Sequence, residues 1–261
     1  MEAKDLTVVI LAGGLGTRLR EETEYKPKPM VEIGGKPIIW HIIKNLSTQG
    51  VSKFLICTGY KSQSIKDYFI NYTSNSSDMK IKFGPEPTIQ YLSEESGNDW
   101  EVSIVYTGEL TPTGGRLYKA RKSIQTNHFL CVYGDGLSDI SLHNLITSHK
   151  NSGKSATVTA VQPVSRFGVL DIGSTGEVKS FKEKPKLDGW INAGYFIFPR
   201  EFLSTLNEDS TLETDPLYKL ALTGNLNAYK HDGFWQPMDT YRESSLLNDL
   251  WSNGKSPWKN W

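Results

Sequence analysis

Apolar and polar positions follow one another in blocks that predict alternating strands and helices through the first half of the chain. Short apolar runs such as residues 6–12 (LTVVILA) and 53–59 (KFLICTG) have the length and composition of buried strands. Between them, residues 37–46 (PIIWHIIKNL) open with proline and repeat apolar side chains at helical spacing. The same reasoning predicts helices at 64–72 and 115–124, and strands at 102–108 and 128–136, the latter with a turn at its end.

The second half is richer in short strands separated by Gly and Ser. A polar stretch from 73 to 100 predicts a long connection with one short strand near 79–83. The elements expected beyond residue 150 are strands at 155–162, 167–173, 177–183, 192–198 and 226–231, and helices near 199–206, at 215–223 and at 241–252.

Strand–helix alternation favours an α/β fold with a mostly parallel sheet covered on both faces. Right-handed crossovers make such a sheet open and doubly wound, as in Rossmann-like folds, and here a smaller β-rich part follows it. We expect one domain over residues 1–261, in two halves near 1–150 and 151–261. Ligands of these sheets bind beyond the carboxyl ends of the strands, where the chain places Gly13–Arg18 and Asp135.

Charge and composition remove several classes of function. Lys plus Arg and Asp plus Glu each number 29, so the chain lacks the basic field of a nucleic-acid binder. No apolar run approaches the roughly 20 residues of a membrane span, and the first residues are typical of a strand and not of a signal peptide. Cys57 and Cys131 each stand in an apolar run, which predicts buried, reduced thiols and a cytoplasmic protein.

The glycine-rich turn LAGGLGTRL (11–19) is the strongest chemical signal. Glycines after a buried strand let backbone N–H groups approach phosphate oxygens, and Arg18 adds a fork-shaped donor. No Gly-Lys-Ser/Thr follows, which excludes a Walker A loop. Leu19 stands where a dinucleotide fingerprint needs its third glycine. By itself, the turn is as consistent with a tight loop as with a ligand site.

A lysine between two prolines follows this turn. Pro27 and Pro29 predict extended backbone around Lys28, which would point that side chain in one fixed direction. An ordinary solvated loop lysine remains the alternative.

Taken together, LAGGLGTRL and KPKPMVEIGGKPIIWHI resemble the signature of the sugar-1-phosphate nucleotidyltransferases. The resemblance is strongest to the bacterial glucose-1-phosphate cytidylyltransferase branch and runs nearly end to end. It continues through TGGR (113–116), YGDG (133–136), RFGVLDI (166–172), FKEKP (181–185), INAGYFIF (191–198) and FWQPMDT (234–240).

The resemblance implies transfer of a cytidylyl group from CTP to glucose 1-phosphate by a Mg²⁺-dependent enzyme that assembles as a homo-oligomer. It makes Asp135 and Asp239 the Mg²⁺ ligands, and Arg18, Lys28 and Asp135 the catalytic residues. It assigns nucleotide binding to the first half and sugar-phosphate binding to the second. The implied nucleotide-binding residues are Leu11, Ala12, Gly13, Gly14, Leu15, Gly16, Thr17, Arg18, Lys28, Thr111, Arg116 and Gly134, and the sugar-phosphate residues are Gly168, Glu183, Lys184, Asn192 and Gly194.

Several alternatives stay open at this point. The same chemistry could use another nucleoside triphosphate or sugar phosphate, and a non-catalytic regulatory domain could bind sugar nucleotides on this scaffold. A nicotinamide-dependent dehydrogenase is disfavoured by the missing third glycine. His41, on an apolar helix, is interpreted as structural, and the tryptophans near the C-terminus either pack on their own domain or anchor an interface.

Overall fold

The structure is a computed structural model that describes residues 1–92, 99–165 and 167–261, without the side chains of Arg18, Arg20 and Glu21. A seven-stranded sheet in the order β14-β10-β13-β8-β1-β4-β7 forms its centre. Strand β13 runs against both of its neighbours, whereas the other neighbouring pairs are parallel. The prediction of a mostly parallel sheet is therefore confirmed. The strands are β1 Thr7–Ala12, β4 Lys53–Thr58, β7 Glu101–Tyr106, β8 His128–Tyr133, β10 Ala156–Val161, β13 Ile191–Pro199 and β14 Leu226–Lys230.

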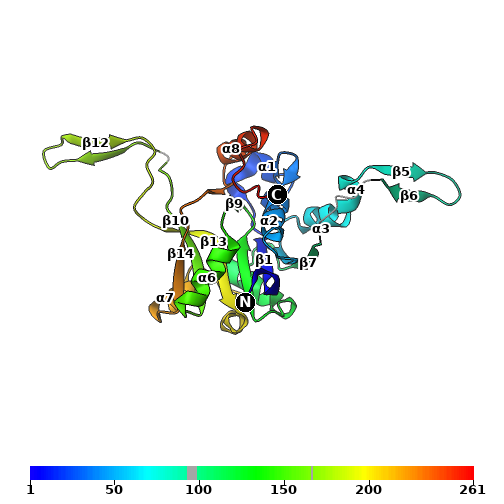
Figure 1. Ribbon diagram of the computed structural model, residues 1–261, viewed down its shortest axis with the longest axis horizontal. Coiled ribbons are helices and arrows are strands. Elements are labelled where there is room, and N and C mark those ends of the chain that lie inside the picture. The colour runs from blue at the N-terminus through cyan, green and yellow to red at the C-terminus, as the bar shows by residue number, and fades with distance from the viewer. Residues whose placement is uncertain (93–98, 166) are drawn as a thin grey trace.

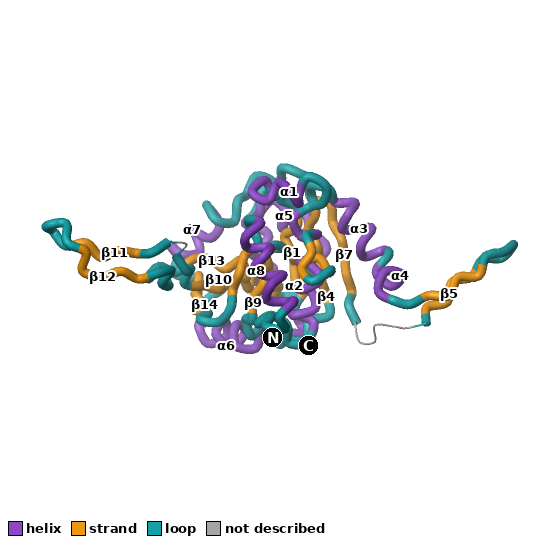
Figure 2. The backbone as a smooth tube through the Cα atoms, turned by 90° about the horizontal axis from the view of Figure 1, so that it is seen from above, coloured by secondary structure: helices purple, strands orange, loops and turns teal. Residues whose placement is uncertain are grey.

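Apolar side chains on both faces of the strands explain why helices cover both sides of this sheet (Figures 1 and 2). In β1, Val8 and Ile10 point into one buried cluster and Val9 into the other. The first cluster includes side chains of α2 (Ile38–Ser47), α3 (Ser62–Ile70), α6 (Leu142–Ser152) and α8 (Tyr241–Ser252). The second includes side chains of α5 (Thr113–Ala120), η5 (Arg200–Thr205) and α7 (Asp215–Leu222).

The position of β1 creates the crevice in which the site lies. It pairs in parallel with β4 on one side and with β8 on the other, so the chain winds away from β1 in two directions. The carboxyl ends of β1 and β8 are therefore neighbours, and at such a reversal point open α/β sheets bind their ligands.

Two hairpins project from opposite sides of this body (Figures 1 and 2). One pairs β5 (Met79–Lys82) with β6 (Thr88–Tyr91), and the other pairs β11 (Val169–Ile172) with β12 (Val178–Lys182). Large apolar side chains on both are exposed, among them Ile89, Leu170 and Phe181.

Several elements differ from expectation. Helix α6 was not predicted, although Ser141 caps its first turn and Gly153 ends it with a φ of 61°. The polar stretch after residue 72 contains α4 (Tyr72–Ser76) and a hairpin in place of one short strand, and residues 93–98 of it lie outside the described residues. The helix expected near 199–206 is the 3₁₀ helix η5.

Some short elements were also missed. The segment 128–136 forms a strand, His128–Tyr133, followed by a turn, as predicted, but β9 (Gly136–Ser138) directly after the turn was not expected. Its partner β15 (Trp235–Pro237) and the pair β2 (Glu32–Ile33) and β3 (Lys36–Pro37) were not expected either. Runs of two or three residues carry too little periodicity to be recognised.

The C-terminal tail packs onto its own domain. Trp258 is fully buried, and its indole N–H donates to His41 Nδ1 at 3.3 Å. His41 Nε2 in turn donates to the Ile33 carbonyl at 2.8 Å, so both ring nitrogens are satisfied without a ligand. The structural interpretation of His41 agrees with this arrangement.

The two cysteines are unpaired and buried, as expected. Burial raises the pKa of the Cys57 thiol to about 12, so the thiol is held in its protonated, unreactive form. Within the described residues, no helix combines the length and the apolar character that crossing a bilayer requires.

Candidate active site

A pocket of about 360 Å³ opens where the carboxyl ends of β1 and β8 meet. That volume lies in the range usual for small-molecule sites, roughly 300–1,000 Å³. The lining includes most of the nucleotide-binding and metal residues expected from the sequence. The described residues around it are Leu11, Ala12, Gly13, Gly14, Gly16, Thr17, Lys28, Pro29, Thr111, Pro112, Thr113, Arg116, Tyr133, Gly134, Asp135, Glu213 and Asp239.

Two glycines of the turn after β1 are required by its geometry. Gly16 has a φ of 65°, in the left-handed region that side chains disfavour. A Cβ on Gly13 would lie 1.9 Å from the Arg116 guanidinium, so a larger residue there would displace the arginine from its hydrogen bonds. The conformation of the glycine turn therefore depends on the positive φ of Gly16 and on the close contact of Gly13 with Arg116.

Arg116 holds this part of the pocket together from below. Only 4% of the residue is exposed, and its guanidinium donates to backbone carbonyls of three separate segments. The acceptors are Gly13 O at 2.9 Å, Gly108 O at 2.7 Å, Glu109 O at 3.1 Å and Thr58 O at 3.3 Å, and the Thr107 hydroxyl accepts at 2.8 Å. Arg116 thus fixes the glycine turn to the end of β4 and to the loop after β7. Its expected role in reading the base stays a prediction.

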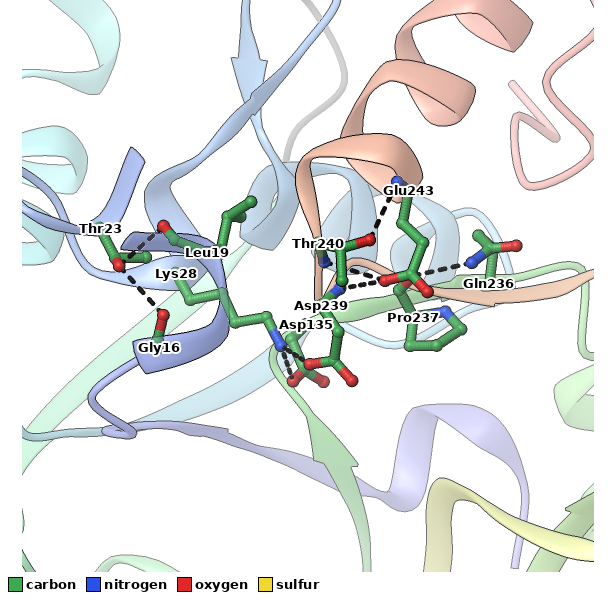
Figure 3. Close-up of polar contacts among 10 residues, drawn as sticks. All are labelled: Gly16, Leu19, Thr23, Lys28, Asp135, Gln236, Pro237, Asp239, Thr240 and Glu243. Carbon is green, nitrogen blue, oxygen red and sulfur yellow. Dashed lines mark hydrogen bonds and ion pairs between the residues drawn. The ribbon is translucent and has the colours of Figure 1, made fainter. Parts of the chain in front are cut away.

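Lys28 is the central cation of the site (Figure 3). The chain is extended at Pro27 but turns into the 3₁₀ helix η3 (Lys28–Met30), so the expected extended conformation is wrong at Lys28 itself. The side chain is buried, and its ammonium donates to Asp135 Oδ2 at 2.6 Å and to Asp239 Oδ1. Burial lowers the pKa of Lys28, but the charges and hydrogen bonds of the two carboxylates outweigh it, and the pKa is raised.

Asp135 and Asp239 meet because a short antiparallel ladder joins their segments. Strand β9 begins directly after Asp135, and β15 ends two residues before Asp239. Gly136 is paired with Pro237, and the Met238 N–H donates to the Asp135 carbonyl at 2.8 Å. The carboxylates, 104 positions apart in the sequence, are therefore placed by backbone hydrogen bonds.

The start of α8 fixes the second aspartate more firmly. Thr240 and Glu243 form a reciprocal capping box, in which the Glu243 carboxylate accepts the Thr240 N–H at 2.9 Å. The same oxygen accepts the Asp239 N–H at 2.7 Å (Figure 3). Glu243 is nearly buried, so it orients the Asp239 backbone without facing the pocket lining.

Tyr133 connects the pocket with part of the expected sugar-phosphate site. Its hydroxyl contacts Glu213 and accepts from the Asn192 amide at 3.4 Å. Gly194, with a φ of 79°, lies against the Tyr133 ring, and its N–H donates to Asn192 Oδ1 at 2.7 Å. Asn192 and Gly194 therefore lie directly behind a residue of the lining.

Other expected residues are not part of the described lining. Glu183 and Lys184 follow β12 at the base of the projecting hairpin, where their side chains are about half exposed and pair with each other at 3.6 Å. Gly168 lies beside Phe181 on the same hairpin. Leu15 is exposed next to the glycine turn. The side chain of Arg18 lies outside the described part of the structure.

The charges of the pocket suit a divalent cation. Its described lining carries two cationic side chains, Lys28 and Arg116, and three anionic ones, Asp135, Glu213 and Asp239. The described residues contain no group of three or more His, Cys, Asp or Glu arranged as a complete metal cage. Mg²⁺ is usually held by one or two carboxylates together with substrate phosphates, so the aspartate pair fits such an ion.

Sequence reasoning missed several residues of this site. Tyr133 begins the YGDG motif but was not singled out as a site residue, whereas Glu213 has no local motif and reaches the pocket only through the tertiary structure. Glu243 did carry a signal, because Thr240-x-x-Glu243 ahead of a helix is the pattern of a capping box.

Known proteins resemble this chain along its full length. A family model described as nucleotidyl transferase matches residues 7–241. Glucose-1-phosphate cytidylyltransferase of Salmonella typhi is 48% identical over 259 residues, covering 98% of this chain and 100% of that protein. A probable glucose-1-phosphate cytidylyltransferase of Bacillus subtilis is 39% identical over 258 residues, with the same coverage of both chains.

A solved structure agrees with these relatives. HddC from Yersinia pseudotuberculosis superimposes with a TM-score of 0.70 and 26% identity, over 94% of this chain and 99% of that one. Because the family model and the full-length relatives agree, this chain belongs to the nucleotidyl transferase family and, within it, to the sugar-1-phosphate nucleotidyltransferases.

Proposed function

We propose that this enzyme transfers the cytidylyl group of CTP to α-D-glucose 1-phosphate, giving CDP-glucose and pyrophosphate. The relatives that are 48% and 39% identical over the whole chain support this substrate pair. The observation that carries the chemistry is the convergence of Lys28, Asp135 and Asp239 beside the glycine turn.

In the proposed reaction, a phosphate oxygen of glucose 1-phosphate attacks the α-phosphorus of CTP. A new P–O bond forms as the bond from the α-phosphorus to the bridging oxygen breaks, and that oxygen leaves with its electron pair in pyrophosphate. A covalent enzyme intermediate is unnecessary, because transfers of this kind depend mainly on positioning and charge stabilisation. A Mg²⁺ ion held by Asp135 and Asp239 would supply positive charge to the reacting phosphates.

The protein's own groups have separate parts in this scheme. Lys28 and the backbone amides of the glycine turn hold the triphosphate, and Arg18 stabilises the departing pyrophosphate. Thr111 lines the pocket and reads the base, and Arg116 supports this reading by holding the loop around Gly108 against the glycine turn. In this arrangement the first half of the chain binds the nucleotide.

The second half binds the sugar phosphate. Asn192 and Gly194 contact Tyr133, which lines the pocket, and the Asn192 amide is the group proposed to bind sugar hydroxyls. Lys184 holds the sugar phosphate and Glu183 accepts from sugar hydroxyls. Both lie at the base of the β11–β12 hairpin, so the hairpin has to approach the pocket when the sugar phosphate binds.

We further propose that the protein works as a homo-oligomer in the cytoplasm. Its accessible surface is 14033 Å². A folded monomer of this mass usually exposes about 2,500 Å² less. An excess of this size is comparable to the area that stable subunit interfaces bury. The excess agrees with the two projecting hairpins and their exposed apolar side chains. The buried, unpaired cysteines support a reducing compartment.

Light scattering on the eluting protein tests the oligomer. We expect a mass that is a multiple of the subunit, and a lower mass for Leu170→Lys, which puts a charge on the exposed hairpin face. Ser174→Lys, in the turn of the same hairpin, is the matched control and should leave the mass unchanged. A wild-type protein that elutes as a monomer would contradict the proposal.

Pyrophosphate release with each of the four nucleoside triphosphates tests the substrate assignment. With Mg²⁺ and glucose 1-phosphate, CTP should be preferred over ATP, GTP and UTP, and mannose 1-phosphate should replace glucose 1-phosphate poorly. Equal rates with another triphosphate would overturn the choice of CTP, whereas binding without any turnover would indicate a regulatory protein.

A further inference from the structure

The Lys28 ammonium occupies the position between two carboxylates at which a metal ion is expected. It donates to one oxygen of Asp135 at 2.6 Å and to one of Asp239 (Figure 3). With the lysine in place, the three side chains carry one net negative charge, and without it the two aspartates would carry two. A divalent cation meeting this group therefore finds half of the negative charge already neutralised.

The carboxylates and the lysine differ in how firmly they are held. The aspartates are attached to the β9–β15 ladder and to the start of α8, whose hydrogen bonds fix their backbone. The ammonium ends a flexible four-carbon side chain that can swing without moving the backbone. When a second cation competes for the same oxygens, the lysine is the group that can move away.

We propose that Lys28 is a built-in counter-ion of the Asp135–Asp239 pair, and that it couples loading of the divalent cation to arrival of the nucleotide. This inference rests on the proposed function. Before the nucleotide binds, the ammonium occupies the carboxylates and weakens their hold on free divalent ions. A triphosphate entering the pocket offers the ammonium other anionic oxygens, and the lysine then leaves the aspartates available for the metal.

Coupling of this kind gives a definite order of events. Before the nucleotide arrives, the aspartates hold a divalent cation only weakly. A bound triphosphate first draws the ammonium off the aspartates, which then become available to the cation. The empty site also avoids holding two uncompensated carboxylates in a partly buried position, which would be costly.

Direct metal binding to the nucleotide-free protein tests the proposal. Mn²⁺ is the probe, and its free concentration is followed by electron paramagnetic resonance, with wild type compared with Lys28→Met. An opposite charge at this range changes a carboxylate's affinity for a proton by about 10- to 1,000-fold. By analogy, we expect Lys28→Met to bind Mn²⁺ at least about 10-fold more tightly than wild type.

Two further variants show whether the tighter Mn²⁺ binding of Lys28→Met arises at the aspartate pair. Lys26→Met is the matched control, because Lys26 also contacts two carboxylates, Glu22 at 3.7 Å and Glu32 at 3.6 Å, but on the surface. It should change Mn²⁺ affinity by less than about twofold, since exposed ion pairs are weak. Adding Asp135→Asn to Lys28→Met should abolish the gain.

Three results would overturn the proposal: Lys28→Met binding Mn²⁺ no more tightly than wild type, an equal gain in Lys26→Met, or a gain that persists in the double variant. Lys28→Gln replaces Lys28→Met if the latter does not unfold cooperatively. Because no nucleotide is present, these outcomes do not depend on whether CTP is the substrate, which the pyrophosphate assay decides separately.

Discussion

At the scale of single residues, the two cationic side chains of the pocket lining have different tasks: Arg116 is structural, and Lys28 belongs to the reaction chemistry. Arg116 uses its guanidinium on backbone carbonyls of the glycine turn, of the end of β4 and of the loop after β7. Lys28 uses its ammonium on two carboxylates that face the pocket. Both residues stand beside motifs in the sequence, and only the contacts reveal their different tasks.

Replacing Arg116 by Met should therefore affect the fold as well as ligand binding. The change leaves the partly buried Gly108 carbonyl without a donor and leaves the Gly13 carbonyl with only the Tyr60 N–H at 3.3 Å. We expect the free energy of unfolding to fall by about 3 kcal/mol, measured by chemical denaturation. Arg121→Met, in the next turn of the chain, is the control and should cost less than about 1 kcal/mol. An unchanged stability of Arg116→Met would show that the carbonyls do not need the arginine.

At the scale of elements, two short features bring the aspartates together. The β9–β15 ladder joins the segments, and the capping box of α8 orients Asp239 through the Glu243 carboxylate. A carboxylate that is positioned in this way can bind a cation with little reorganisation.

Glu243→Ala should lower turnover although Glu243 does not line the pocket. The N–H groups of Asp239 and Thr240 would lose their acceptor, and supporting residues of this type typically contribute about 10- to 100-fold to activity. Glu243→Gln keeps an acceptor oxygen and should restore most of the turnover. Ser141→Ala removes the cap of α6 and should lower stability by about 1 kcal/mol with unchanged turnover. Equal turnover in Glu243→Ala and Ser141→Ala would refute a positioning role.

The elements also show which parts of the fold and of the site could be predicted from the sequence. The strands of the sheet and the site residues at their ends were predictable, because apolar runs and glycine turns are local signals. Glu213 was not, since it joins the pocket only through the packing of the loop before α7, and Tyr133 was overlooked although it directly precedes Gly134 and Asp135 in the YGDG motif. The long polar stretch after residue 72 hid a hairpin whose side chains are exposed and therefore show no burial pattern.

At the scale of the whole molecule, stability is linked to pH through two buried histidines. Desolvation lowers the pKa of His41 to about 4, and it lowers the pKa of His149 to about 4 as well. Both side chains are therefore neutral in the folded state near neutral pH, where each is hydrogen-bonded. The unfolded chain takes up protons below an ordinary pKa of 6.5, and the folded chain does so only near 4.

The free energy of unfolding should consequently fall as the pH drops from about 6.5 towards 4. Each histidine contributes about 2 kcal/mol of this loss by pH 5. Denaturation curves at pH 7 and pH 5 measure this loss of unfolding free energy. His41→Gln should reduce the pH dependence of the unfolding free energy by the contribution of about one proton. His143→Gln, at an exposed position, controls for the substitution itself. A protein that becomes more stable on acidification would contradict this assignment.

The most direct measurement is ³¹P NMR of CTP, glucose 1-phosphate and Mg²⁺ mixed with the enzyme. The signals of CDP-glucose and pyrophosphate should appear together and should be absent when a chelator is added. With Asp135→Asn, whose fold is verified by its melting curve, product formation should be at least about 100-fold slower, since a group that stabilises transition-state charge is lost. Full activity of a folded Asp135→Asn, or equal rates with chelator, would show that the aspartate pair does not hold the cation for this reaction.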